Sequence, residues 1–202
     1  MSGSDSQREL QELREELGQC TRCSLSEGRT SIVFGDGASS ARVIFVGEAP
    51  GFNEDIQGLP FVGSAGKLLS RFLEEIGLDR PSVYITNIVK CRPPNNRDPL
   101  TDEIETCRPF LSRQIRIIKP KLICTLGNHA THTILGRSVG ITKIRGKLQE
   151  VEGLFIFPML HPAAALHRGD MMEKVQEDFQ NLGKFLHEDR EPDPVQKQLE
   201  LF

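Results

Sequence analysis

The sequence predicts an α/β fold in which helices cover both faces of a parallel sheet. Short apolar runs alternate with segments of helical periodicity, which is typical of strands joined by right-handed crossovers. The apolar runs are nearly continuous, as in strands that are buried on both faces. The 202 residues, 38% of them hydrophobic, are enough for one compact domain with a sizeable core.

The expected elements follow one another in a regular order. Leu10, Leu13 and Leu17 recur at helical spacing, which predicts a first helix from Gln7 to Gly18. Apolar runs predict four strands, at Val43–Val46, Val83–Val89, Leu122–Leu126 and Phe155–Leu160. Periodic segments predict further helices at Ser64–Ile76, at Thr101–Ile118, in a short stretch ending at Leu135, and at about Asp170–His187. Charge and proline content predict a flexible tail over 188–202, after a domain over 1–187.

Composition and charge exclude several classes of protein. No apolar run reaches the roughly 18–20 residues that cross a bilayer, and the polar, acidic N-terminus resembles neither a signal peptide nor a transit peptide. We therefore expect a cytoplasmic protein without membrane contact. The net charge is −3, but nine basic residues and no acidic residue lie between Glu105 and Glu150. This stretch is a candidate for binding a polyanion, with ordinary solvated charge as the alternative.

The spacing of the cysteines predicts a metal centre. Cys20 and Cys23 form a C-x2-C pair, and 15 residues separate Cys91 from Cys107. In an intracellular protein such cysteines are more often metal ligands than disulfides. Zinc sites usually use two tight pairs, so the long gap favours an iron–sulfur cluster over zinc, with unligated thiols as a third alternative. Cys124 lies inside an apolar run and is expected to be a buried strand residue.

Polar side chains stand at the ends of three predicted strands. Glu48 follows the first strand, Asn87 ends the second, and His161 follows the fourth. Each of them alone has an ordinary explanation as a loop acid, a turn residue or a helix cap. Ligands of open parallel sheets bind outside the carboxyl ends of the strands, so the three together favour a site at that edge. A glycine-rich segment, 58–66, lies between the first strand and its helix.

The sequence lacks the motifs of three common kinds of site, which excludes those sites. Lys67 follows a glycine, but the G-x4-G-K-[ST] spacing of a nucleoside triphosphate pocket is absent. The G-x-G-x-x-G of dinucleotide binding does not follow a strand, and the G-x-S-x-G of serine hydrolases does not occur. The strand-end residues therefore belong to another chemistry.

Four segments together resemble the iron–sulfur uracil-DNA glycosylases of family four. They are GEAPG (47–51), GLPFVGSAG (58–66), TNIVKCRPPNNRDP (86–99) and HPAAALHR (161–168), framed by the four cysteines. The resemblance covers roughly residues 15–187 and implies a three-layer α/β/α sandwich around a four-stranded parallel sheet. It also implies a monofunctional glycosylase with one structural 4Fe–4S cluster held by Cys20, Cys23, Cys91 and Cys107.

The same resemblance implies roles for the residues of the pocket. His161, Glu48 and Asn87 would carry catalysis: His161 would face the uracil O2 that becomes negative, and Glu48 would help to hold the water. Uracil would be bound by Phe61, which stacks on it, by Asn87, which reads its polar edge, by Glu54 as a wall against the methyl group of thymine, and by Ala49, Gly47 and His161. Related enzymes carry an aspartate where Ala49 stands, so the group that activates the water is left open.

Elementary chemistry agrees with these roles. Breaking the N-glycosyl bond builds negative charge on uracil, and a fixed donor at that charge lowers the barrier by about 3–4 kcal/mol. The amide of Asn87 can match the donor and acceptor of one uracil edge, whereas cytosine reverses that pattern.

Contacts with DNA are expected next to the pocket. The base must leave the stack, and Leu166 is the candidate wedge that fills the gap, with packing under the loop as the alternative. Four basic residues are expected to contact phosphates: Arg168, Lys143, Arg145 and Lys147. No inserted loop with a histidine separates Cys91 from Cys107, so ordinary turnover is expected instead of covalent trapping of DNA.

The tail predicts a second interaction. Gln196, Leu199 and Phe202 match Q-x-x-L-x-x-F, and the overlapping QLELF resembles a bacterial clamp-binding pentapeptide, so a sliding clamp is a candidate partner. A chance match is the alternative, since such motifs are short. We expect a monomer that acts on uracil-containing DNA in the nucleoid. Two rival functions are a glycosylase for other deaminated bases and a catalytically silent DNA-binding or polymerase accessory module.

Overall fold

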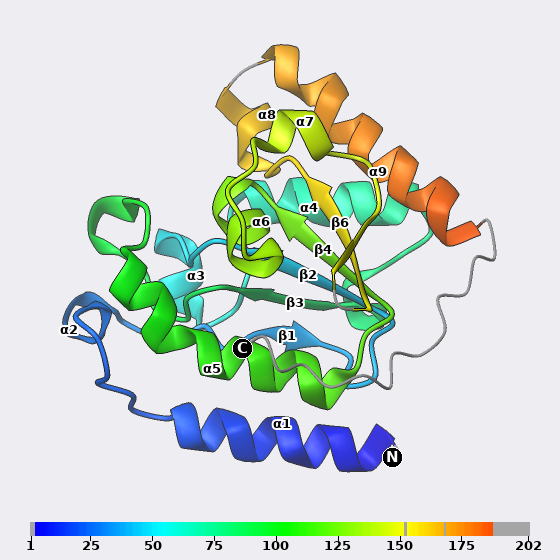
Figure 1. Ribbon diagram of the computed structural model, residues 1–202. Helices are drawn as coiled ribbons and strands as arrows, with labels where there is room; N and C mark the ends of the chain where they lie inside the picture. The colour runs from blue at the N-terminus through cyan, green and yellow to red at the C-terminus, as the bar shows by residue number, and fades with distance from the viewer. Residues whose placement is uncertain (1–2, 152, 168, 188–202) are drawn as a thin grey trace.

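A six-stranded sheet forms the middle layer of the molecule (Figure 1). The computed structural model describes residues 3–151, 153–167 and 169–187. The strands follow the order β1-β3-β2-β4-β6-β5 across the sheet. Its four central strands run parallel and are β2 (Val43–Gly47), β3 (Tyr84–Asn87), β4 (Leu122–Leu126) and β6 (Leu154–Met159). They are the four predicted strands, with ends that differ from prediction by at most two residues.

The predicted number of strands was wrong, because two short edge strands complete the sheet. β1 (Asp36–Gly37) pairs antiparallel with β3, and β5 (Gln149–Val151) pairs antiparallel with β6. Neither contains a continuous apolar run. An edge strand of two or three residues buries too little surface to produce a recognisable pattern.

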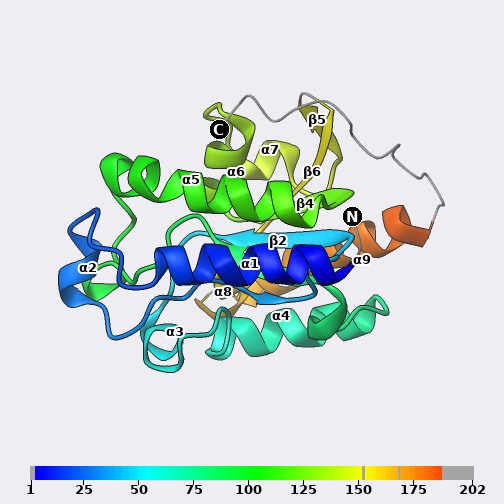
Figure 2. The ribbon, with the colours of Figure 1, turned by 90° about the horizontal axis from the view of Figure 1, so that it is seen from below.

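Three helices cover one face of the sheet: α1 (Gly3–Leu17), α5 (Thr101–Ile118) and α6 (Asn128–Leu135) (Figures 1 and 2). α1 lies alongside α5, and its Leu13 and Leu17 are buried there. Phe110 and Ile115 of α5 belong to the same apolar cluster as Ile44 of β2. The leucine spacing that predicted the first helix therefore marks the face by which it packs.

The other face is covered by α4 (Ser64–Glu75), α8 (Ala163–His167) and α9 (Met172–His187). The short helix α7 (Ile141–Ile144) lies beside β6, with Ile141 in the apolar cluster of this layer and Ile144 against the cluster of the other layer. Phe179 of α9 joins this layer to the sheet. Its ring stacks on Phe72 of α4, with centroids 5.0 Å apart, and on Phe45 of β2, at 6.4 Å. Helices on both faces of a mainly parallel sheet confirm the three-layer α/β/α fold.

Short segments connect these elements, most of them at the carboxyl ends of the parallel strands and η1 just before the start of β3. They are α2 (Leu25–Gly28), α3 (Phe52–Gln57) and the 3-10 turns η1 (Arg80–Ser82), η2 (Pro94–Asn96) and η3 (Gly169–Met171). Within the described ranges no helix has both the length and the apolar character needed to span a membrane. Gln196, Leu199 and Phe202 lie outside the described residues, so the clamp motif and the tail remain predictions.

Candidate active site

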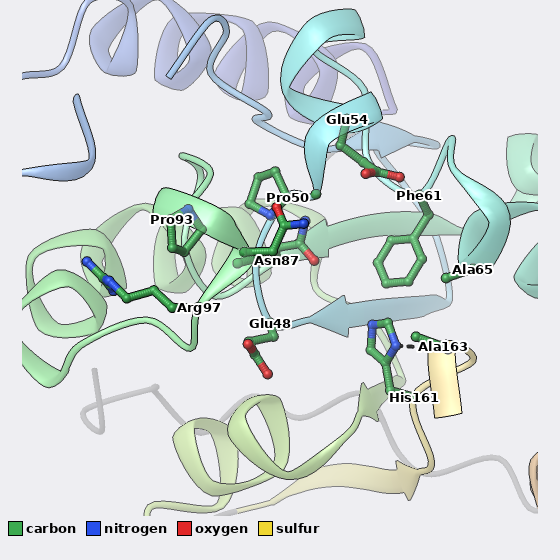
Figure 3. A pocket seen from close by; sticks show the side chains of 13 residues that line it. Glu48, Pro50, Glu54, Phe61, Ala65, Asn87, Pro93, Arg97, His161 and Ala163 are labelled. Carbon is green, nitrogen blue, oxygen red and sulfur yellow. Dashed lines mark hydrogen bonds between the residues drawn. The ribbon is translucent and has the colours of Figure 1, made fainter. Parts of the chain in front are cut away.

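A pocket of about 430 Å³ lies at the carboxyl ends of β2, β3 and β6 (Figure 3). Glu48, Asn87 and His161 come from the ends of these three strands and line it together. Ala49, Glu54 and Phe61 line it as well. The other lining residues are Pro50, Gly51, Ala65, Pro93, Asn96, Arg97 and Ala163. The structure thus brings one set of predicted uracil-contacting side chains into a single cavity.

Asn87 presents an unused polar atom to this pocket. Its Oδ1 is buried and has no hydrogen-bond partner among the described residues. Leaving such an atom unpaired costs about 1–3 kcal/mol, which is expected where a ligand supplies the partner. Gly47, which pairs with Asn87 in the sheet, makes room for it. A Cβ at Gly47 would lie 2.4 Å from Asn87 Oδ1 and 2.7 Å from Cζ of Phe61.

Phe61 is held in an unusual backbone conformation beside Asn87. Its φ of 52° lies in the left-handed region, which is rare for a residue with a side chain. Oε1 of Glu54 accepts hydrogen bonds from the backbone N–H groups of Val62 and Gly63, at 2.9 and 2.8 Å. Arg80 donates to the carbonyl of Phe61 at 3.0 Å. These contacts fix the aromatic ring at the pocket wall.

His161 packs beside the ring of Phe61 in the pocket lining, with ring centroids 5.5 Å apart (Figure 3). Its Nδ1 accepts a hydrogen bond from the backbone N–H of Ala163 at 3.1 Å, so the neutral ring carries its proton on Nε2. Burial lowers the pKa of His161 to about 4, and the carboxylate of Glu54 partly opposes this shift. At neutral pH the imidazole is therefore uncharged and offers one N–H donor.

Glu48 lies next to a histidine that sequence reasoning missed. Burial raises the pKa of the Glu48 carboxyl group, His129 opposes the rise, and Asp98 adds to it. His129 stands at the start of α6, directly after the carboxyl end of β4. The signal for it is the one that marks Glu48, Asn87 and His161, namely a polar residue just after a predicted strand, here the third.

Lys90 lies behind the pocket in the protein interior. Its side chain is fully buried and donates to Oγ1 of Thr86 at 2.6 Å, to the carbonyl of Asn87 at 2.8 Å and to Oε1 of Gln114 at 2.7 Å. Burial lowers its pKa to about 8. The ammonium group thus holds the backbone of Asn87, and Lys90 is not among the residues that line the pocket.

The four cysteines of the predicted metal centre come together from three segments. Cys20 and Cys23 lie between α1 and α2, Cys91 follows β3, and Cys107 lies on α5. Burial raises the pKa of Cys107 to about 11, and the thiols of Cys91 and Cys23 add to this rise. Cys124 is buried in β4.

Glu103 on α5 connects the segment of the first two cysteines to the pocket rim. Its carboxylate accepts hydrogen bonds from Ser24 Oγ at 3.2 Å, from the backbone N–H of Leu100 at 2.7 Å, and from the guanidinium of Arg97 at 2.6 and 2.9 Å. Its side chain is 0% exposed. The hydrogen bond from Arg97 is the largest cause that lowers the pKa of Glu103 to about 2.

We expect Glu103→Gln to lower the free energy of unfolding at pH 7 by about 2 kcal/mol. The pKa of Glu103 is depressed in the folded state, so its stabilisation is complete above pH 4.5 and is lost as pH falls toward 2. The difference in melting temperature between the variant and the native protein should therefore shrink on acidification. Glu105→Gln is the matched control, because Glu105 is exposed and pairs with Arg108 on the same helix. Equal losses in both variants, or a loss that does not change with pH, would contradict this assignment.

The residues predicted to contact DNA lie in different environments. Leu166 is 45% exposed on α8, three residues after Ala163 of the pocket lining. Lys143 on α7 and Lys147 just after it are exposed. Arg168 lies outside the described residues. Leu166 is thus the predicted contact that lies next to the pocket along the chain.

Arg145 is engaged inside the protein instead. Its Nε lies 3.0 Å from Oδ1 of Asp178, its Nη2 lies 2.8 Å from Glu177, and its side chain is 18% exposed. Asp178 also accepts a hydrogen bond from the backbone N–H of Leu160 at 2.8 Å. Arg145 thereby joins α9 to the segment that carries His161.

The basic stretch between Glu105 and Glu150 does not form one surface. Arg108 and Arg113 lie on α5, where they pair with Glu105 and Glu16. Arg145 pairs with Glu177 and Asp178 of α9, on the opposite face of the sheet. A count of charges along the sequence therefore overstates the basic area available to a polyanion.

Comparison with known proteins gives a consistent result. A family model described as the uracil DNA glycosylase superfamily matches residues 34–183. The chain is 50% identical to a protein named type-4 uracil-DNA glycosylase from Sulfurisphaera tokodaii, over 86% of this chain and 83% of that protein. Proteins of the same name from Saccharolobus solfataricus and Archaeoglobus fulgidus are 47% and 43% identical, over 86% and 87% of this chain and 85% and 92% of their own lengths.

Proposed function

This chain belongs to the uracil DNA glycosylase superfamily, and we propose that its pocket binds a uracil flipped out of DNA and promotes hydrolysis of the N-glycosyl bond. The enzyme is a uracil-DNA glycosylase, a glycosidase of DNA repair, whose products are free uracil and an abasic site. The observation that carries the assignment of the pocket is the buried Oδ1 of Asn87, which has no partner among the described residues and lies beside the fixed ring of Phe61.

The reaction exchanges a carbon–nitrogen bond for a carbon–oxygen bond. The bond between C1′ of the sugar and N1 of uracil breaks, and its electron pair leaves with uracil. The oxygen of a water molecule bonds to C1′, and that water loses a proton. Because uracil becomes negative while the bond breaks, the protein gains most from donors already fixed at the uracil oxygens.

His161 is proposed to be such a donor. Its Nδ1 is occupied by the N–H of Ala163, so Nε2–H is free to meet the O2 atom of uracil. The ring is neutral and packed against Phe61, so little reorganisation is needed as charge develops. Phe61 itself stacks on the bound base.

Asn87 is proposed to select the base. Its amide offers one acceptor and one donor, which match the N3–H and O4 of uracil. Cytosine presents the opposite pattern and would leave buried polar atoms unpaired. Glu54 forms the wall that a thymine methyl group would meet, and Gly47 and Ala49 leave room for the flat base.

Leu166 is proposed to fill the gap that the flipped base leaves in the stack. It is exposed and close in the chain to His161 and Ala163, so it reaches DNA when uracil occupies the pocket. Lys143, Lys147 and Arg168 are proposed phosphate contacts. Arg145 contributes by supporting the His161 segment, since Asp178 and Glu177 occupy its guanidinium.

A 4Fe–4S cluster is proposed to be held by Cys20, Cys23, Cys91 and Cys107. Among the described residues no three of these sulfur atoms lie within 4.8 Å of one another. The thiols are nevertheless close enough to act on one another, since Cys23 and Cys91 raise the pKa of Cys107, and Cys20 and Cys23 raise the pKa of Cys91. Arg29 donates to the Cys91 sulfur at 3.3 Å, and backbone N–H groups of Leu25 and Lys90 donate to Cys23 and Cys107. Such donors stabilise thiolate ligands, and the bound cluster would cross-link three segments of the chain.

We expect Cys107→Ser to lose most of the iron of the purified protein and its brown colour. The melting temperature should fall by about 5–10 °C, because the cross-link between α5 and the other segments is lost. Iron content, the visible absorption spectrum and thermal unfolding measure these effects. Cys124→Ala is the control, since Cys124 is buried in β4, and it should keep about four iron atoms per chain. A protein that binds no iron when prepared without oxygen, or that keeps it in Cys107→Ser, would contradict the proposal.

Two further roles are proposed beyond the pocket. The enzyme acts as a monomer on the DNA of the nucleoid. The C-terminal motif of Gln196, Leu199 and Phe202 docks into a groove of a sliding clamp. The test of the clamp contact is binding of the full chain to a clamp with and without Phe202→Ala. Equal binding by the two proteins would count against it.

Base selectivity tests the proposed function against the broader glycosylase. Four matched duplexes carry uracil, thymine, cytosine or hypoxanthine at one position. We expect release of uracil alone, since Asn87 and Glu54 exclude the two other pyrimidines and a stacked Phe61 leaves no room for a purine. Faster release of hypoxanthine than of uracil would favour the broader glycosylase.

A further inference from the structure

His129 lies beside the pocket and has no role in the uracil binding and hydrolysis described above. Its Nε2 is 3.2 Å from Oδ2 of Asp98 and 4.0 Å from Oε2 of Glu48. The three atoms lie within 4.8 Å of one another. They come from separate segments, namely the loop after β2, the loop before α5 and the start of α6. Figure 3 shows the carboxylate of Glu48 at the edge of the pocket, below Asn87.

We propose that His129, anchored by Asp98, positions the Glu48 carboxylate so that this carboxylate accepts the proton of the attacking water. His129 is a positioning residue here, because it acts through Glu48 and does not touch the substrate. The water oxygen bonds to C1′, the C1′–N1 electron pair leaves with uracil, and the proton passes to Glu48 and later to the uracil anion. The inference rests on the proposed role of Glu48 in holding the water.

Among the described residues that line the pocket, the other ionisable side chains are engaged elsewhere. Glu103 binds Arg97, the backbone of residues 62 and 63 binds Glu54, and the N–H of Ala163 binds the neutral ring of His161. The charged groups that act on Glu48 are therefore His129 from α6 and Asp98 from the loop before α5.

The charges around Glu48 predict the direction in which its pKa, and with it the pH–rate profile, changes when His129 is replaced. Burial raises the pKa of Glu48, His129 opposes that rise, and Asp98 adds to it. Removing His129 leaves burial and Asp98 unopposed, so the pKa of Glu48 rises further. A protonated carboxyl group cannot take the proton of the water. The acid limb of the rate profile should therefore move to higher pH when His129 is replaced.

The test is the pH profile of single-turnover uracil release by the cluster-loaded full chain and its His129→Gln variant. Glutamine keeps a polar side chain at this partly exposed site and is uncharged at every pH. We expect the acid limb to move up by about 0.5–1 pH unit, with release several-fold slower on that limb and within about twofold of the native rate on the plateau above it. The dissociation constant for uracil-containing DNA should be unchanged.

Two variants separate positioning from a general structural effect. His132→Gln is the matched control, since His132 lies on the same helix and contacts the carbonyl of Val139 at 2.9 Å, and it should not move the acid limb. In a Glu48→Gln background, His129→Gln should cause no further loss, because the group it acts through is gone.

The inference is overturned by equal slowing at every pH, by the same displacement in His132→Gln, or by a full additional loss in the Glu48→Gln background. A native protein that releases no uracil would instead overturn the proposed function. An active native protein with an unaffected His129→Gln variant overturns this inference alone.

Discussion

His161→Ala is expected to slow the single-turnover release of uracil by about 100- to 1,000-fold, the loss typical of removing one fixed donor from a developing anion. The affinity for uracil-containing DNA should change by no more than a few-fold, because the donor matters mainly when uracil carries charge. The neutral state of His161, with its pKa of about 4, predicts that this difference stays constant between about pH 6 and pH 9.

His161→Gln is the informative companion to this variant. A glutamine amide can still donate to O2, although it does not stack on Phe61 as an imidazole does. We expect it to recover part of the lost rate. Equal rates for the native protein and His161→Ala, or a loss confined to DNA binding, would remove His161 from the catalytic role.

Asn87→Asp is expected to lower uracil release by about 100-fold and to produce measurable release of cytosine. The carboxyl group can accept from the N4 amino group of cytosine, and in its protonated form it donates to N3. With uracil in the pocket, the ionised carboxylate has no N–H to donate to the O4 atom. The comparison requires matched duplexes that carry uracil or cytosine at the same position, and the released base is identified directly.

A second variant separates base reading from packing at this position. Asn87→Ala removes both hydrogen-bonding groups and should lose uracil release without gaining cytosine release. Lys90 still holds the backbone at position 87 in both variants, so the two chains should have similar folds. If Asn87→Asp stays inactive on both bases while folding normally, the edge-reading role of Asn87 is wrong.

The fold was predictable because its central strands are buried on both faces. Strands such as Leu122–Leu126 appear as continuous apolar runs, and the helix Thr101–Ile118 was placed at its observed bounds. β1 and β5 were not predictable, since their few residues form backbone pairs at the sheet edges without burying an apolar pattern. Backbone pairing by itself leaves no signature in the choice of side chains.

The pocket was predictable as a set of strand ends but not in its supporting contacts. The left-handed backbone of Phe61 depends on Arg80, 19 residues away. The inward turn of Arg145 depends on Asp178, 33 residues away. Such pairings are set by tertiary structure, and a charged residue read locally is expected to be solvated. His129 differs, because its place at a strand end was visible in the sequence.

We propose that this pocket releases uracil from DNA. The most direct measurement of this claim is the single-turnover reaction of the purified, cluster-loaded protein with an oligonucleotide that contains one uracil, with DNA binding measured on the same sample. Free uracil and an intact strand with one abasic site are the predicted products. Tight binding of this DNA with no uracil released would contradict the claim and would favour a silent DNA-binding module.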